Sequence, residues 1–246
     1  MQHGNNPKDR GCPRSQFKEN VVIVSSKIIV SDKPLSYSPV RSLYTAEERF
    51  ADVRRTLISV RRHIPNAYIL LIDNSILTQE QRVGLCKLSD IFLNIKSDKY
   101  MNHCTDRSPY KGAGECIQLI SAIRYLVKHK VSFSRLFKIT GRYLLAEDFS
   151  MEPYLRRGNV FRRDSTVLDR EYYFTCFFKL DISSLKQFYG ALLEIMRSYN
   201  SRDFKRFGGW ADIEVMLPIA LGKNFEEITY LGVIQKVAVK KTISTI

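Results

Sequence analysis

Cysteine is scarce in this chain, and its few copies are scattered. The sequence holds five cysteines among 246 residues, and none of them forms a C-x-x-C pair. They stand at Cys12, Cys86, Cys104, Cys116 and Cys176. An odd number without close spacing predicts neither a disulfide framework nor a zinc site, and it favours a reducing compartment.

Long apolar runs are absent as well. No stretch reaches the roughly 18 consecutive apolar residues that a membrane-spanning helix requires. The segment 1–10 also lacks the apolar core of a secretory signal peptide. We therefore expect a soluble, cytoplasmic protein with no membrane span.

Acidic residues are outnumbered by basic ones. The chain has 39 Lys and Arg against 25 Asp and Glu, a formal net charge of +14. Such a balance favours anionic partners, which include nucleic acid, nucleotides, phosphorylated substrates and acidic membrane surfaces. The basic residues form small dispersed groups, such as Arg54-Arg55 and Arg162-Arg163, rather than one dense tract. This dispersal disfavours a nucleic-acid partner.

Internal repeats and low-complexity tracts are absent too, and 44% of the residues are hydrophobic. A chain of this length buries a large core, and we expect a single domain over residues 21–246. Residues 1–20 are polar and lack periodicity, so we expect them to be disordered.

The pattern of apolar residues predicts an α/β fold. Val21–Ser26 and Asp90–Ile95 are short apolar runs, and Ala67–Ser75 is apolar without alternation, as in a parallel strand covered on both faces. Between the first two strands along the chain, residues 45–63 predict an amphipathic helix with Thr45 as its N-cap.

The most informative segment is a strand over Leu136–Leu145 that contains Thr140-Gly141-Arg142. In open α/β sheets ligands bind at the carboxyl ends of strands, and a guanidinium there grips a phosphate with two hydrogen bonds. The alternative is a simple turn at Gly141 with Arg142 in solvent.

A second candidate for anion binding is Lys111-Gly-Ala-Gly-Glu115. It opens a predicted helix whose stripe includes Cys116, Ile120, Ile123 and Val127. Glycines at a helix N-terminus allow close backbone approach, and the helix dipole favours an anion.

The second half of the chain predicts further strands and helices. We expect strands over residues 159–163, 172–180 and 227–234, a helix over 183–199, and a late helix that the segment 207–214 enters and that ends at Leu221.

Several motifs in order resemble one enzyme family. They are the strand that ends in Ser25-Ser26, Arg41–Arg49, Ile72–Ser75, Lys111–Glu115, Phe137–Tyr143 and Gly208–Glu214. Together they resemble the small glycosyltransferases encoded by large DNA viruses (chlorovirus-like) and by some bacteria. The resemblance implies a GT-A-type fold, in which a Rossmann-like nucleotide-binding half (about 21–145) and an acceptor-binding half (about 146–246) share one mixed sheet.

The resemblance also implies an activity. The enzyme would move a sugar from a nucleotide-sugar donor, UDP- or GDP-linked, to a glycan, a glycoprotein or another hydroxyl acceptor, in the host cytoplasm if the source is viral. The noncatalytic alternative is a basic nucleic-acid-binding module. A sugar nucleotidyltransferase is the other enzymatic alternative, although the first strand is not followed by the glycine-rich loop that would hold a triphosphate.

Candidate site residues follow from these motifs. For the donor we predict contacts from Ser25, Ser26, Arg49, Asp73, Ser75, Lys111, Gly112, Gly114, Lys138, Thr140 and Gly141. Asp73 would hydrogen-bond to the ribose or the base, and its alternative role is a turn-forming residue. For the acceptor we predict Trp210 and Tyr143. Asp212 is the predicted general base, with Glu214 in reserve, and the alternative for Asp212 is a helix-start carboxylate.

One departure from the family pattern concerns the metal. Many enzymes of this fold carry Asp-x-Asp after the fourth strand, where the carboxylates hold Mn²⁺ or Mg²⁺ against the donor diphosphate. This chain has Thr140-Gly141-Arg142 there, and Glu147-Asp148 follows downstream. Either a divalent metal or Arg142 with Lys138 or Lys111 would balance the leaving diphosphate, and the sequence leaves both open.

Overall fold

A computed structural model describes residues 17–167, 169–236 and 243–246. Within them, one sheet has seven strands in the order β3-β2-β1-β4-β7-β6-β8. Its strands are β1 (Lys18–Ser25), β2 (Ala67–Asp73), β3 (Ile91–Asn94), β4 (Phe133–Thr140), β6 (Val160–Arg162), β7 (Phe177–Asp181) and β8 (Glu226–Ile228). β1 to β4 pair in parallel, whereas β7 runs antiparallel to β4 and β6. The mixed sheet confirms the predicted α/β class.

A smaller antiparallel sheet has the order β10-β9-β5 within the described residues. It consists of β5 (Leu144–Leu145), β9 (Val233–Lys236) and β10 (Ile243–Thr245). β9 pairs with β5 through Leu144↔Ile234 and Leu145↔Val233, so the C-terminal part of the chain returns to the segment that follows β4.

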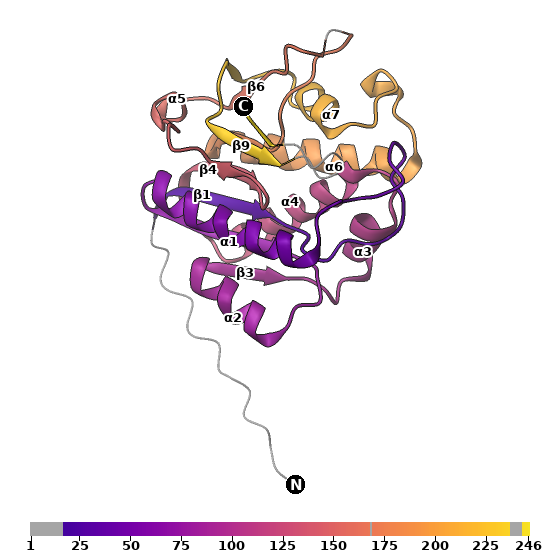
Figure 1. Cartoon of the computed structure of the whole chain (residues 1–246). Helices are drawn as coiled ribbons and strands as arrows, with labels where there is room; N and C mark the ends of the chain where they lie inside the picture. The colour runs from indigo at the N-terminus through magenta and orange to yellow at the C-terminus, as the bar shows by residue number, and fades with distance from the viewer. Residues whose placement is uncertain (1–16, 168, 237–242) are drawn as a thin grey trace.

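Helices cover both faces of the main sheet (Figure 1). They are α1 (Ala46–His63), α2 (Gln79–Leu88), α3 (Lys99–Asn102), α4 (Lys111–Lys128), α5 (Glu152–Leu155), α6 (Leu185–Ser201) and α7 (Ile213–Ala220). Short helical turns lie at η1 (His103–Arg107), η2 (Ile182–Ser184) and η3 (Lys205–Phe207). Among the described helices, none has the length and apolar character that crossing a bilayer requires.

Alternation along β1 divides the core into two layers. Val21 and Ile23 pack in a cluster with residues of α4, α6 and α7. Val22 and Val24 point to the opposite face, where they pack with residues of α1. Successive side chains of a strand face opposite ways, so a continuous apolar strand such as β1 supplies both layers.

Helix α1 begins where the sequence predicts. The Thr45 side chain accepts a hydrogen bond from the Glu48 backbone, and the Glu48 side chain accepts one from the Thr45 backbone. This reciprocal pair satisfies two of the free amides at the helix start. The capping box therefore fixes the first turn, from which Arg49 projects.

Four sequence predictions of secondary structure were partly wrong. β1 begins at Lys18, so residues 18–20 are strand, while residues 1–16 of the expected disordered segment lie outside the described residues. The strand expected over 136–145 ends at Thr140, and β5 belongs to the other sheet. The strand expected over 227–234 is likewise two strands, β8 and β9. Residues 172–176 precede β7 rather than forming part of it.

The late helix begins within the segment expected to lead into it, whereas one residue of the α4 stripe needs correction. Helix α7 begins at Ile213, after the glycine pair Gly208-Gly209, which takes positive φ angles of 65° and 86°. Such angles cannot continue a right-handed helix. Val127 is 63% exposed, so it does not belong to the buried stripe of α4.

Gly112 is required by helix packing. A Cβ at this position would overlap the hydroxyl oxygen of Tyr199 and lie 2.9 Å from its Cζ. The Tyr199 hydroxyl donates to the carbonyl of Ala211 at 2.9 Å and its ring stacks on Tyr110, so the tyrosine cannot move aside freely.

We predict that Gly112→Ala destabilises the protein by about 1–3 kcal/mol, the usual cost of overpacking a core. Gly190 is the matched control, because it is an exposed glycine inside α6 and a methyl group added to it would have no atom within 4 Å. Gly190→Ala should stabilise by roughly 0.5–1 kcal/mol through helix propensity. Urea unfolding measures both, and equal effects of the two variants would contradict the packing argument.

Candidate active site

Three strand ends meet at one edge of the main sheet. Ser25 at the end of β1 is in register with Ile72 of β2 on one side and with Thr140 of β4 on the other. Because these strands are parallel, their carboxyl ends lie together, which is where ligands bind in open α/β sheets. The structure therefore brings the motifs of β1 and β4 to one place.

A small cavity of about 110 Å³ opens at this edge. Eight of the predicted site residues line it: Ser25, Ser26, Arg49, Lys111, Gly114, Thr140, Gly141 and Arg142. The sequence did not single out Lys27 or Gln118 as site residues, although both also line the cavity. Gln118 lies on α4 and donates to the carbonyl of Ser26, so it braces the cavity wall.

The turn after β4 is drawn against the end of β1. The Gly141 amide donates to the Ser25 carbonyl at 2.8 Å. A Cβ on Gly141 would lie 3.1 Å from the Cβ of Ser26 and 3.3 Å from the Ser25 oxygen, so only glycine allows this approach without displacement. Glycine at this position therefore sets the path of Arg142, which follows it.

Arg142 is buried at the junction of the two sheets. Its side chain is 5% exposed, and Nη1 donates to the Lys236 carbonyl of β9 at 3.0 Å. The guanidinium also lies 5.5 Å from the centre of the Tyr143 ring. The predicted alternative, an Arg142 in solvent, is therefore wrong.

Arg49 reaches the same cavity from α1. Its Nε donates to the Lys27 carbonyl at 2.7 Å and its Nη1 to the Ser42 hydroxyl at 3.2 Å. Burial, together with the charge of Arg142, lowers the pKa of Arg49 to about 9. Arg49 is consequently still cationic at neutral pH.

Lys138 does not line the small cavity. Its ammonium is 1% exposed and contacts the Glu115 carboxylate, the Thr140 hydroxyl at 2.9 Å and the Thr175 carbonyl at 2.6 Å. An ammonium has three donors, and all three are satisfied by the protein. This arrangement corrects the expectation that Lys138 faces the donor diphosphate.

Asp73 and Ser75 brace the loop after β1. The two carboxylate oxygens of Asp73 accept from the Ile28 amide at 2.9 Å and the Ser75 amide at 2.6 Å. The Ser75 hydroxyl accepts from the Ile29 amide at 2.8 Å. Asp73 is fully buried and lies outside the cavity lining, so its geometry favours the turn-forming alternative over a contact to ribose or base.

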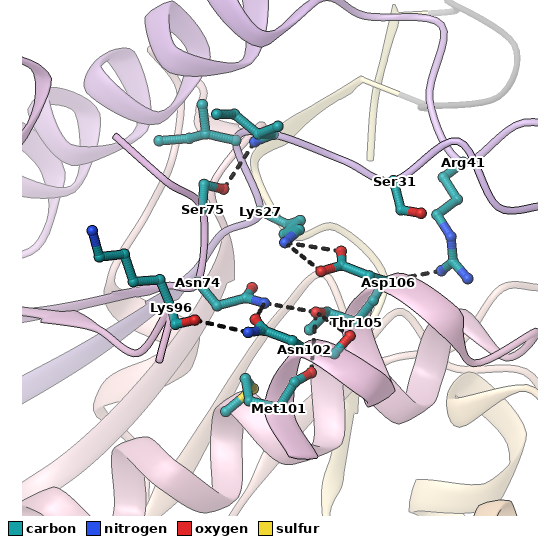
Figure 2. A network of polar contacts seen from close by, with 12 residues as sticks. Lys27, Ser31, Arg41, Asn74, Ser75, Lys96, Met101, Asn102, Thr105 and Asp106 are labelled. Carbon is teal, nitrogen blue, oxygen red and sulfur yellow. Dashed lines mark hydrogen bonds and ion pairs between the residues drawn. The ribbon is translucent and has the colours of Figure 1, made fainter. Parts of the chain in front are cut away.

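A polar network joins this loop to η1, as Figure 2 shows. Lys27 pairs with Asp106 at 2.9 Å. Asn74 donates to the Asn102 side chain at 2.8 Å and to the Thr105 hydroxyl at 2.7 Å. No sequence pattern singled out Asp106, because its partner lies 79 positions away. The network holds one wall of the small cavity in place.

A larger cleft of about 590 Å³ adjoins the small cavity. Its volume lies in the range of roughly 300–1,000 Å³ that is typical of small-molecule sites. Predicted residues in its lining are Lys111, Gly112, Arg142, Tyr143, Asp212 and Glu214. The lining common to both cavities consists of three cations, Arg41, Lys111 and Arg142.

Asp212 and Glu214 lie at the start of α7. Asp212 is the N-cap residue, but its side chain makes no capping hydrogen bond. Asp212 therefore stands at the helix start, as the alternative predicted, but its side chain does not bond to the helix amides there. Glu214 accepts from the Thr175 hydroxyl at 3.3 Å.

The electrostatics of Glu214 and Lys111 are coupled. Burial raises the pKa of Glu214, and the Lys111 ammonium opposes this shift. Desolvation is the largest single influence and acts to lower the pKa of Lys111, but Glu214, Tyr143 and Glu115 together outweigh it, and the pKa lies above the ordinary lysine value. Lys111 therefore remains charged between the two cavities.

Trp210 stands beside the larger cleft and outside its lining. The Arg170 guanidinium, which does line the cleft, lies 4.0 Å from the centre of the indole ring. A cation at this distance covers one ring face. Arg170 therefore stacks on Trp210, the predicted acceptor platform. No sequence pattern had pointed to Arg170.

The residues after β4 do not fit a divalent metal. Mn²⁺ and Mg²⁺ prefer carboxylate oxygens, and the cavity wall there offers Thr140, Gly141 and Arg142. Glu147 pairs with Arg62, and Asp148 accepts from the Tyr230 hydroxyl; neither lines the small cavity or the larger cleft. Among the described residues, no group of three or more potential metal ligands occurs.

The sheet order, the covering helices and the ligand edge define an α/β fold of the GT-A glycosyltransferase type. The chain is similar in fold to the glycosyltransferase GlyE of Streptococcus pneumoniae, with a TM-score of 0.50 and 9% identity over 87% of this chain and 45% of GlyE. This chain thus spans about 45% of the length of GlyE.

Other solved structures match with lower scores. The apo form of GlyE has a TM-score of 0.49 and 9% identity, over 86% of this chain and 45% of GlyE. The apo form of mouse xyloside xylosyltransferase 1 has a TM-score of 0.48 and 10% identity, over 87% of this chain and 85% of that one. No protein-family profile matches the chain, and no curated protein matches it in sequence.

We predict that the stability of Glu214→Gln relative to that of the wild type increases as the pH rises above the unfolded pKa of glutamate, about 4.3. A raised folded-state pKa means that the contribution of Glu214 to stability is present below its unfolded pKa of about 4.3 and is lost as the pH rises through the folded value. Glutamine carries no charge and escapes this loss. Urea unfolding at pH values from below to well above that unfolded pKa measures the difference.

The control is Glu80→Gln, because Glu80 is exposed on α2. Its difference from the wild type should vary little with pH. If the stability difference between Glu214→Gln and the wild type is equally independent of pH, then burial does not raise the pKa of Glu214.

Proposed function

We propose that the protein is a glycosyltransferase that moves a sugar from a nucleotide-sugar donor to a hydroxyl acceptor. One observation carries the proposal: a small cation-lined cavity and a larger cleft that includes the carboxylates Asp212 and Glu214 meet at the carboxyl edge of the sheet and share Arg41, Lys111 and Arg142. A donor laid across this boundary has its diphosphate among cations and its sugar in the cleft. The GT-A-type fold supports the same conclusion.

The donor side is built from two strand ends and two helices. Ser25 and Ser26 supply hydroxyls next to the close turn at Gly141. We propose a UDP- or GDP-linked sugar here, with its diphosphate toward Arg142. Arg41 is held by the Lys33 carbonyl at 2.9 Å and the Thr105 carbonyl at 3.1 Å, so it supports the wall more than it offers free donors.

The reaction we propose breaks the bond between the anomeric carbon and the phosphate oxygen. The acceptor hydroxyl oxygen forms the new bond to that carbon, the nucleoside diphosphate leaves with the electron pair, and the hydroxyl proton passes to a carboxylate if configuration inverts. Asp212 is the proposed base, because it lines the cleft and its side chain makes no capping bond. Glu214 is the second candidate.

The acceptor side is aromatic and acidic. Tyr143 lines the cleft, and Trp210 with Arg170 borders it. Aromatic rings pack well on apolar surfaces while keeping a polar edge in water. We propose a glycan or a glycoprotein as acceptor, and the cytoplasm, that of the host if the source is viral, as the compartment.

A donor screen tests the function. Each common UDP- and GDP-linked sugar is incubated with the protein and a mixed panel of glycans and glycoproteins, and release of nucleoside diphosphate is measured. We expect release with one donor that depends on acceptor. Binding of nucleic acid that falls steeply with salt, without sugar transfer, would favour the nucleic-acid-binding alternative. Pyrophosphate release from a sugar phosphate and a nucleoside triphosphate would favour the nucleotidyltransferase.

We predict that Asp212→Asn lowers the rate of transfer roughly 10²-fold to 10⁴-fold. Asparagine preserves the shape of the side chain and cannot accept the proton. Donor affinity should change little, because Asp212 does not line the small cavity in which we place the donor diphosphate. Steady-state rates at saturating donor, together with calorimetric donor affinity, measure the two effects.

Asp203→Asn is the control, since Asp203 is an exposed residue whose side chain accepts a hydrogen bond from the backbone amide of Lys205, at the start of η3. It should transfer sugar at the wild-type rate. Wild-type turnover by Asp212→Asn would move the role to Glu214, and Glu214→Gln would be measured next. Full activity in both variants would favour a retaining mechanism without such a base.

A further inference from the structure

Three cations from separate elements converge on the small cavity. Arg49 comes from α1, Lys111 from the start of α4, and Arg142 from the turn after β4, and all three line the cavity. The two arginines are 7% and 5% exposed. We call these three residues the cationic cradle.

The arginines of the cradle bond to neutral groups. Arg49 donates to a carbonyl and a hydroxyl, and Arg142 to a carbonyl. Within the part of the chain that the structure describes, no ion pair within 4.0 Å joins either guanidinium to a carboxylate. A buried cation without a counter-charge is costly, so these sites usually have an anionic partner.

The carboxylates near the cradle bond to other groups, although one buried oxygen of Asp52 has no hydrogen-bond partner in the described part of the chain. Asp52 is paired with Lys236 at 2.5 Å, and Glu115 contacts the buried ammonium of Lys138. Asp73 accepts from two backbone amides. Asp52 and Asp73 still act on Arg49 through space, and Glu214 acts on Lys111, but among the described residues no ion pair within 4.0 Å joins a carboxylate to Arg49, Lys111 or Arg142.

The cradle arginines repel each other. The charge of Arg142 adds to burial in lowering the pKa of Arg49. Two like charges held this close raise the free energy of the empty site, and an anion bound between them removes that cost. An anion with more than one negative charge lowers the free energy of the site most.

We propose that the cationic cradle binds the donor diphosphate directly and takes the place of the divalent metal that this fold commonly uses. The inference rests on the proposed function and specifies how the leaving group is held. Each guanidinium offers a planar fork of donors that matches phosphate oxygens. Lys111 adds a point charge where the cavity meets the cleft.

The cradle also suits the chemical step. As the bond from sugar to phosphate breaks, a further negative charge develops on the departing phosphate oxygen. Fixed cations aimed at that oxygen stabilise the developing charge without reorganising. Among the described residues, the end of β4 offers no pair of free carboxylates that would hold a metal ion for the same purpose.

Calorimetry with UDP and GDP tests the proposal. Titrations are carried out in EDTA and in Mn²⁺, with the wild type and with Arg49→Met and Arg142→Met. We expect one nucleotide to bind in EDTA with the affinity found in Mn²⁺, within about twofold, and each variant to bind it at least tenfold more weakly. Inorganic pyrophosphate should displace the nucleotide from the wild type.

Two further variants keep the test decisive. Arg54→Met is the matched control, because Arg54 is exposed on the same helix as Arg49 and lines neither cavity; its nucleotide affinity should equal that of the wild type. Arg142→Lys keeps the charge and loses the planar fork, so it should also bind more weakly. Thermal unfolding establishes that each variant is folded.

The outcomes separate the inference from the proposed function. Nucleotide binding that requires Mn²⁺ would overturn the cradle and leave the glycosyltransferase proposal standing. Wild-type affinity in EDTA for folded Arg49→Met and Arg142→Met would do the same. Absence of UDP and GDP binding under both conditions would overturn the proposed function and the cradle with it.

Discussion

The close approach between the Gly141 turn and the end of β1 is the constraint on which the site depends. The hydrogen bond from the Gly141 amide to the Ser25 carbonyl draws the chain after β4 across the edge of the sheet. A side chain at position 141 would meet Ser26 and prevent this. Because the turn is held there, Arg142 is directed toward Arg49 and the small cavity instead of toward solvent.

Charge is divided between the two halves of the site. The small cavity is lined by several cations and one carboxylate, Glu115, which contacts Lys138, whereas the larger cleft is lined by three carboxylates, Asp164, Asp212 and Glu214. Lys111 stands between them, and its mutual influence with Glu214 links the two regions electrostatically. A substrate with an anionic end and a hydroxyl-bearing end matches this division, which is the physical basis for proposing transfer from a nucleotide sugar.

The sequence predicted the local features well. Each of these features depends on a few neighbouring residues: the capping box at Thr45, the unbroken apolar strand β2 and the glycine at the turn after β4. Side-chain partners from distant segments were not predictable. Lys138 looked like a phosphate ligand beside Thr140, yet its contact with Glu115 of α4 turns it inward.

From the amino-acid sequence alone an α/β chain can be predicted, with local chemical signals: strand ends with hydroxyls, a glycine turn and an excess of positive charge. Which cations remain available for an anion depends on the folded arrangement. Pairing is a matter of distance between segments far apart in sequence, and it committed Lys138 to Glu115 and Asp52 to Lys236. Arg142 faces the cavity because parallel strands bring their carboxyl ends to the same edge, and Arg49 reaches the same cavity from helix α1.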